Sequence, residues 1–162
     1  MNTYFTSQSR RQLLADEAEK WRGTPFMPNG CIKGAGVSCQ KLVGALYIAT
    51  GVWPEDLKVP DGPMGWSNAH EDSLITAVME GEVKAGRFAD VSDFSEVMPG
   101  DLVGFKLGGC LHHLGVTLTT SGMFVHCIRG PGVMFSELRD ATYLKRIEKI
   151  WRPLECQPGG SR

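Results

Sequence analysis

The feature that most constrains the fold of this chain is a change of hydrophobic periodicity near residue 100. Before it, apolar residues recur at helical spacing, as with Leu14, Ala18 and Trp21 on one face of a first helix. After it, short apolar runs separated by glycine-containing turns indicate strands, which we expect over 101–105, 111–118, 123–128 and 147–152. Helices followed by antiparallel strands predict an α+β domain, with the N-terminal helices packed on a central antiparallel β-sheet.

Capping and breaking residues set the expected helix ends. The first helix is expected to begin near Ser9, which opens a capping-box pattern, and to end at Gly23. A later helix is expected over 67–80, capped at its first residue and ended by Gly81. The glycine- and proline-rich stretch 24–37 predicts an extended loop after the first helix.

Length and charge limit the number of domains and the classes of function that we expect for this chain. The 162 residues fit one domain over 1–156, followed by a tail at 157–162, QPGGSR, that we expect to be disordered. A net charge of −1 at pH 7 argues against a non-specific nucleic-acid binder, which needs a basic face. No apolar run approaches the roughly 20 residues of a membrane span. The segment 1–21 lacks the apolar core of a signal peptide, so we expect synthesis in the cytoplasm without a classical signal.

Cys39 stands where the second helix is expected to start, within GVSCQKLVGALYIATG at 36–51. Ser38 before it is a good N-cap residue, and Gly51 is the expected stop. Unpaired backbone N–H groups and the helix dipole favour a thiolate at such a position and can stabilise an oxyanion. A small buried cysteine without chemistry is the alternative interpretation. The five cysteines are an odd number, and a Cys31–Cys39 disulfide, which requires an oxidising compartment, would leave Cys39 unreactive.

A thiolate nucleophile needs an imidazole base and a group that orients it, and two of the four histidines fit these roles. In the expected strand CLHHLGVTLTT, alternation puts His113 with Gly115 and Thr117 on a small, polar face with room for a helix or a substrate. The turn TTSG predicts a hairpin, which brings His126 of the next strand, MFVHCI, close to His113. His113 is the candidate base and His126 the candidate orienting residue, with a purely structural role as the alternative for either one.

Four motifs in order along the chain resemble the NlpC superfamily of papain-like cysteine peptidases, best known for cutting bacterial cell-wall peptides. They are GTPF at 23–26, GVSCQKLV at 36–43, MPGDLVGF at 98–105 and HLGV at 113–116, the last followed by a strand with FVHC. The resemblance extends from about Ala15 to Trp151 and implies the papain-like NlpC fold. The KGAG loop before the cysteine resembles the branch encoded by phages and prophages.

Carried over position by position, the resemblance makes Cys39 the nucleophile, His113 the base and His126 the orienting residue. It assigns Asp101 to a structural turn. It implies a cysteine peptidase or amidase that hydrolyses amide bonds in peptidoglycan stem peptides through a thioester acyl-enzyme, with no metal and no cofactor. It also implies action at the bacterial cell wall after delivery by a phage tail, a secretion machine or lysis.

Two departures from the family pattern fall close to the expected substrate. The family usually has aspartate before the cysteine, where this chain has Ser38, and in many members that aspartate is linked to recognising the free amine of a cut stem peptide. The tyrosine of the family's GTPY-type loop is Phe26 here, which keeps the ring and loses a hydroxyl donor. Together with Trp66, in a proline- and glycine-rich connection, these two residues are the candidate substrate-binding residues.

Three alternatives stay open at this point. Cys110, His112 and Cys127, with the two candidate histidines, carry metal-ligating groups, although neighbours on a strand face opposite ways and Cys-x-x-Cys pairs are absent. By the same alternation we expect His112 to pack against the sheet face opposite His113. A non-catalytic module of the same fold, such as a phage-tail structural subunit or a wall-binding protein, would explain the altered residues around the cysteine. An acyltransferase or a protein deamidase would use the same nucleophile.

Overall fold

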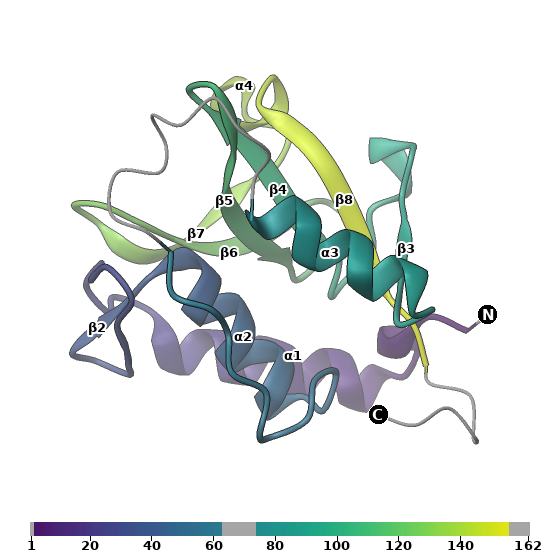
Figure 1. Cartoon of the computed structure of the whole chain (residues 1–162), viewed down its shortest axis with the longest axis horizontal. Coiled ribbons are helices and arrows are strands. Elements are labelled where there is room, and N and C mark those ends of the chain that lie inside the picture. The colour runs from purple at the N-terminus through teal and green to yellow at the C-terminus, as the bar shows by residue number, and fades with distance from the viewer. Residues whose placement is uncertain (1, 63–73, 156–162) are drawn as a thin grey trace.

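The computed structural model describes residues 2–62 and 74–155, and it has helices packed on an antiparallel sheet, which confirms the predicted α+β class. The helices are α1 (Gln8–Trp21), α2 (Cys39–Ala49), α3 (Leu74–Lys84) and α4 (Ala141–Leu144), with 3₁₀ turns η1 (Tyr4–Thr6) and η3 (Phe94–Glu96). The strands of the main sheet are β3 (Phe88–Asp90), β4 (Leu102–Leu107), β5 (Cys110–Thr117), β6 (Met123–Ile128), β7 (Gly132–Glu137) and β8 (Ile147–Pro153). They are arranged in the order β3-β8-β4-β5-β6-β7, and α1 and α2 lie together on one side of this sheet (Figure 1). Within these ranges no helix is long and apolar enough to cross a membrane.

The first helix begins earlier than its sequence pattern indicated. Ser7, not Ser9, caps α1, because the Ser7 side chain accepts a hydrogen bond from the backbone N–H of Arg10. The Ser9 hydroxyl lies 3.1 Å from that of Ser7, inside the first turn. The helix does begin next to Ser9, but Ser9 as its cap was wrong, since either serine fits the local spacing. At the other end α1 stops before Gly23, whose φ of 75° requires glycine, as expected.

The start of α2 agrees with its prediction, whereas the end of α3 does not. Ser38 caps α2 by accepting a hydrogen bond from the Lys41 backbone N–H, so the helix begins at the cysteine. α3 continues through Gly81 to its last turn and stops before Gly86, where φ is 72°. A glycine weakens a helix but does not end it when the backbone stays helical. The expected beginning of this helix at 67 lies outside the described residues.

The sheet has more strands than the sequence patterns indicated. β6 begins and ends where it was expected, but β7 was not predicted, and it pairs with β6 along its whole length. β3 pairs with the end of β8. The stretch 24–37, expected to be an extended loop, contains the two-residue strands β1 (Cys31–Ile32) and β2 (Gly36–Val37), which pair just before α2.

The sheet separates two apolar cores. On one face, residues of α1 and α2 pack against Leu102 and Leu114. On the other face, Phe105 and Phe124 form a smaller core, closed by Tyr143 from the segment after β7. Because both faces are buried, a polar side chain on either face of β5 must find its partners inside the protein.

β5 carries a bulge at the point where α2 approaches it. The pairing with β4 passes from His113, opposite Phe105, to Leu111, opposite Lys106, so the register skips position 112. On its other edge β5 pairs with β6 only over 115–117. Within the described residues, no strand therefore pairs with that edge of β5 before 115. His112, expected on the face opposite His113, is half-buried at the bulge, with its Nδ1 3.4 Å from the Cys110 carbonyl oxygen.

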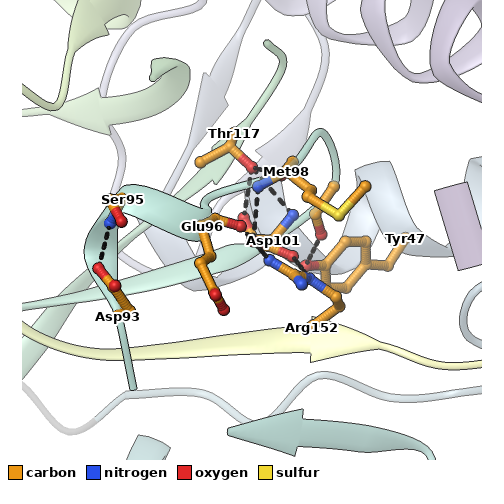
Figure 2. Close-up of polar contacts among 9 residues, drawn as sticks. Tyr47, Asp93, Ser95, Glu96, Met98, Asp101, Thr117 and Arg152 are labelled. Atoms are coloured by element: carbon orange, nitrogen blue, oxygen red, sulfur yellow. Dashed lines mark hydrogen bonds and ion pairs between the residues drawn. The ribbon is translucent and has the colours of Figure 1, made fainter. Parts of the chain in front are cut away.

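A buried charged cluster fixes the start of β4 (Figure 2). Asp101 is 0% exposed, and its carboxylate accepts two hydrogen bonds of 2.8 Å from the Arg152 guanidinium. The same carboxylate accepts a hydrogen bond of 2.9 Å from the Met98 N–H, and the Asp101 N–H donates to Thr117 Oγ1 at 2.9 Å. The cluster thus joins β4, β5 and β8, and Asp101 lies in the turn that opens β4.

The two ends of the described chain meet. Thr3 and Leu154 form an antiparallel bridge, and the Glu155 N–H donates to the Asn2 carbonyl oxygen at 2.9 Å. Both ends are therefore held at the edge of the sheet where β3 and β8 pair.

Candidate active site

Cys39 is the first residue of α2, and its side chain is packed into the protein. Only 7% of the residue is exposed. Its sulfur lies 3.3 Å from Oε1 of Gln40 and 3.8 Å from the carbonyl oxygen of His112. The backbone of Leu114 also approaches the sulfur and acts to lower the pKa of the thiol. The thiol therefore lies against the edge of β5 that β6 leaves unpaired.

Burial raises the pKa of the Cys39 thiol above its ordinary value. Hydrogen bonds from backbone groups of Leu114, Gln40 and Cys39 itself lower the pKa, but burial has the larger effect. The sequence predicted that the helix start would lower the pKa of Cys39. That effect is present, but the opposing effect of burial is larger. The raised pKa favours the thiol form of Cys39 at neutral pH.

His113 and His126 meet across the pair of strands β5 and β6, where Gly115 lies opposite His126. Nε2 of His113 and Nδ1 of His126 are 2.9 Å apart, which is a hydrogen bond between two imidazoles. The expected hairpin does bring the two rings together. Among the described residues, Nδ1 of His113 has no hydrogen-bond partner, so it is the ring nitrogen available to take a proton.

Aromatic rings surround the histidine pair, and the expectation of a small, open, polar face around His113 was wrong. The ring centroid of Phe105 lies 5.5 Å from that of His113, and the centroid of Phe124 lies 4.6 Å from that of His126. His113 is 7% exposed and His126 is 0% exposed. Alternation along β5 indicated the correct face for His113, but it carried no information on the side chains that β4 and β6 place there.

Burial keeps both imidazoles neutral. It lowers the pKa of His126 to about 4, and burial with the neighbouring charges of His126 and His112 lowers the pKa of His113 to about 3. Each ring therefore carries one proton, on one of its two nitrogens, throughout the physiological range. A neutral imidazole near a neutral thiol can act as a general base while the sulfur attacks, without a preformed ion pair.

Two hydroxyl groups continue the hydrogen-bonded chain beyond His126. Nε2 of His126 is 3.0 Å from Oγ of Ser136 in β7, and the Ser136 hydroxyl donates to the Tyr143 hydroxyl at 3.3 Å. The Tyr143 ring, from α4, also packs edge-on against His126, with centroids 5.2 Å apart. Neither residue was predicted from the sequence. The available signal was the alternating run GVMFSE after the glycine turn RGPG.

The structure joins the two histidines to each other but not to the thiol. No hydrogen bond links the Cys39 sulfur to the His113 ring within the described residues. The sulfur instead contacts backbone groups on either side of His113 in the chain, the carbonyl of His112 and the backbone of Leu114. Catalytic hydrogen bonds are often long or misaligned in enzymes without substrate, so this geometry is compatible with a catalytic pair.

The candidate substrate-binding residues differ in what they can offer. Phe26 is half-buried and forms a parallel bridge with Val37, close to the start of α2. Ser38 is buried, and its hydroxyl accepts the Lys41 N–H at 3.4 Å as the helix cap. Trp66 lies outside the described residues. Phe26 thus keeps partly exposed side-chain surface in the loop before α2, whereas Ser38 acts through the helix start.

The described cysteines and histidines bear on two of the alternatives. Cys31, Cys39, Cys110 and Cys127 are free thiols, so the Cys31–Cys39 disulfide is not formed. A metal site would need His112, His113 or His126 to converge with a thiol. In the part of the chain that the structure describes, no three His, Cys, Asp or Glu side chains form a group that could hold a metal ion.

Comparison by sequence finds one curated relative. The chain is 29% identical over 135 residues to the probable endopeptidase NlpC of Escherichia coli (strain K12), an alignment that covers 83% of this chain and 72% of that protein. No family model matches the chain.

Solved structures share the fold. A Staphylococcus aureus protein of the NLP/P60 family, similar to lipoprotein, has a TM-score of 0.63 at 16% identity over 95% of this chain and 44% of that protein. An NlpC/P60 family protein from Bacillus cereus has a TM-score of 0.62 at 18% identity over 90% and 40%. The NlpC/p60 domain of the peptidoglycan hydrolase SagA has a TM-score of 0.54 at 16% identity over 86% and 96%. The chain thus spans less than half of the first two proteins, and at these identities the likeness establishes the fold alone.

Proposed function

We propose that the chain, which is similar to proteins of the NlpC/P60 family, is a cysteine peptidase or amidase that hydrolyses amide bonds in peptidoglycan stem peptides. The observation that carries the proposal is the hydrogen bond between His113 Nε2 and His126 Nδ1, which leaves His113 Nδ1 unbonded. This ring belongs to the strand whose backbone contacts the Cys39 sulfur. A nucleophile, a base and a group that orients the base are the parts that acyl transfer requires.

In the first half-reaction, the carbonyl carbon of the scissile amide bonds to the Cys39 sulfur while the thiol proton moves to Nδ1 of His113. The carbonyl oxygen becomes an oxyanion. Backbone N–H groups of Cys39 and Gln40, at the start of α2, are the available donors for it. The C–N bond then breaks as His113 gives its proton to the leaving amine, and a thioester remains on the enzyme.

In the second half-reaction, water attacks the thioester carbonyl and gives a proton to His113. The C–S bond breaks, the acid product leaves, and the Cys39 sulfur recovers its proton. Throughout both steps His126 accepts the Nε2–H of His113 and so fixes the orientation of that ring. The proposed reaction uses no metal and no organic cofactor.

The proposed substrate draws on the relatives, of which SagA is a peptidoglycan hydrolase and the Escherichia coli protein a probable endopeptidase. Ser38 replaces the aspartate usual in the family, and its hydroxyl is engaged in capping α2. We therefore infer that the stem peptide is recognised without the carboxylate contact to a free amine. The proposed place of action is the bacterial cell wall, reached by a phage tail, a secretion machine or lysis.

A non-catalytic module of the same fold is the competing function, and the burial of the thiol favours it. Cys39 is 7% exposed, its pKa is raised, and it has no hydrogen bond to His113. An acyltransferase or a deamidase differs from the proposed hydrolase only in the acceptor or the donor of the acyl group, since all three form the same thioester.

The test is digestion of purified peptidoglycan by the wild-type chain and by Cys39→Ala, with the released muropeptides identified by mass spectrometry. We expect the wild type to cleave one peptide bond and Cys39→Ala to cleave none. Cys31→Ala is the matched control, because Cys31 is an exposed free thiol. It should retain full activity.

Equal cleavage by wild type and Cys39→Ala would refute Cys39 as the nucleophile. A folded wild-type protein that cleaves nothing, and whose Cys39 reacts with iodoacetamide no faster than Cys31, would favour the non-catalytic module. Transfer of the acyl group to an added amine in preference to water would identify an acyltransferase.

A further inference from the structure

We propose that Ser136 and Tyr143 are positioning residues, whose hydroxyl groups set the tautomers of both histidines so that His113 offers a bare Nδ1 to the thiol. This inference deepens the proposed function and rests on it. It concerns residues that do not touch the reacting atoms. Their effect passes through His126.

The hydrogen bonds allow the protons to be followed one at a time. The Ser136 hydroxyl has a single proton, which it donates to the Tyr143 oxygen at 3.3 Å. Its oxygen must then accept at the second contact, so Nε2 of His126, 3.0 Å away, carries a proton. A neutral imidazole has one N–H, and therefore Nδ1 of His126 is an acceptor.

The same reasoning fixes the proton on His113. Since Nδ1 of His126 accepts, Nε2 of His113, 2.9 Å away, must be the donor. Nδ1 of His113 then has a free lone pair, which is the form that can take the thiol proton. The reverse arrangement would put a proton on Nδ1 of His113 and leave it unable to act as a base.

Burial explains why two hydroxyl groups can control this choice. His126 is 0% exposed and His113 is 7% exposed, so solvent has little access to supply alternative partners to the rings. Their lowered pKa values keep them neutral, and a neutral imidazole exchanges between two tautomers unless its partners select one. Within the described residues the Ser136 hydroxyl is the hydrogen-bond partner at the outer end of the pair.

Tyr143 is held in place by packing as well as by its hydroxyl. Its ring lies edge-on to Phe124 and His126, with centroid distances of 5.1 and 5.2 Å. The turn that carries it is capped by Asp140, whose side chain accepts the Thr142 N–H at 2.7 Å. Tyr143 is half-buried, so its hydroxyl can pass its own proton to solvent while accepting from Ser136.

The first measurement is direct and needs no catalysis. Two-bond ¹H–¹⁵N correlation spectra of the histidine rings report which nitrogen of each is protonated. In the wild type we expect both His113 and His126 to be protonated on Nε2. In Ser136→Ala we expect a second population of each ring, protonated on Nδ1. Ser121→Ala is the matched control, because that exposed hydroxyl hydrogen-bonds with the turn residue Thr119 at 2.8 Å, and the change should leave both rings unchanged.

The second measurement is the kinetics of peptidoglycan cleavage. Ser136→Ala should lower kcat by about 10- to 100-fold with little change in KM, because the substrate still binds but the base is often in the wrong tautomer. Ser136→Thr keeps a hydroxyl and should restore most of kcat. Tyr143→Phe keeps the ring and loses only the hydroxyl, so we expect a smaller fall, since water can accept the Ser136 proton in its place.

These outcomes distinguish failure of the inference from failure of the proposed function on which it rests. An active Ser136→Ala with normal kcat and wild-type ring protonation overturns the inference and leaves the proposed function intact. A lowered kcat with unchanged tautomers, or without rescue by Ser136→Thr, reduces Ser136 to a packing role and also overturns it. A wild type that cleaves nothing, yet changes tautomers on Ser136→Ala, supports the positioning chain while the proposed function fails.

Discussion

Two buried polar clusters lie on the same sheet and are built in opposite ways. At the start of β4, Asp101 and Arg152 keep full charges and pair with each other through two hydrogen bonds. Across β5 and β6, His113 and His126 are linked by one hydrogen bond between neutral rings. Burial disfavours the charged form of the groups in both clusters. Only the first cluster contains a pair of opposite charges that stabilise each other.

The pKa values express this contrast. Burial raises the pKa of Asp101, while the Arg152 guanidinium and the Met98 N–H act to lower it. Burial lowers the pKa of both histidines, and His126 and His112 lower the pKa of His113 further; none of the described carboxylates acts against these effects. The charged cluster has no proton to move at neutral pH, so it serves to join strands. The neutral cluster retains a ring nitrogen that can accept one.

The largest expected effect is the loss of the base in the neutral cluster. We expect His113→Gln to lower kcat/KM for peptidoglycan cleavage on the order of 10⁴-fold, as when a triad member is disabled. Glutamine can still donate a hydrogen bond to His126, so the midpoint of urea unfolding should change little. Activity within tenfold of the wild type would show that the base is another residue.

Breaking the charged cluster should act on stability instead. Asp101→Asn keeps the shape of the side chain but leaves the half-buried Arg152 guanidinium without its counter-charge. We expect the free energy of unfolding, measured in urea, to fall by about 3–5 kcal/mol. Glu19→Gln breaks an exposed ion pair with Arg22, 2.7 Å long, and should leave stability unchanged. Equal stability of the two variants would contradict the structural role given to Asp101.

The neutral cluster also predicts a dependence of stability on pH. His113 and His126 have folded pKa values of about 3 and about 4, below the ordinary value of 6.5. Between these limits the unfolded chain binds protons that the folded protein does not. Stability contributed by the neutral rings is therefore complete above pH 6.5 and is lost as the pH falls toward 4.

The expected slope is about 1.4 kcal/mol per pH unit for each histidine in that interval. Thermal or urea unfolding between pH 7 and pH 4 measures it. Replacing both His113 and His126 by glutamine should flatten the dependence, and an unchanged slope in that double variant would assign the effect to other groups.

The smallest effect is expected at a single neutral hydrogen bond beside the site. Ser38→Ala removes the N-cap of α2, and because the bond to Lys41 is 3.4 Å long, we expect a loss of at most about 1 kcal/mol in unfolding free energy. Ser9→Ala is the matched control, since Ser7 and not Ser9 caps α1. A larger loss for Ser9→Ala than for Ser38→Ala would reverse both assignments.

Local sequence signals were sufficient where a single residue decides the structure. Ser38 identified the start of α2, and the TTSG turn indicated the neighbours β5 and β6, which bring His113 and His126 together. These signals failed where two neighbouring residues could both cap a helix, as Ser7 and Ser9 can. They also failed at Gly81, where the helix continues through the glycine.

The side chains that surround the candidate site could not be predicted from the sequence of any single strand. Alternation gave the face of His113, but Phe105 and Phe124 reach that face from β4 and β6. Ser136 and Tyr143 come from the segment after β6, where β7 itself was missed. Alternation also does not predict the bulge at which the β4 register skips His112, because a single extra residue in a strand does not change the composition detectably.

The bridge between Thr3 and Leu154 has a consequence for protein engineering. Because the two ends are held together, a short peptide can join them and new ends can be opened elsewhere, for example in the turn between β5 and β6. In Figure 1 the bridged ends lie at the side of the molecule opposite β2, which leads into α2. A tether or a fused domain attached at either end would thus leave the surface around Cys39 open to a bulky polymer.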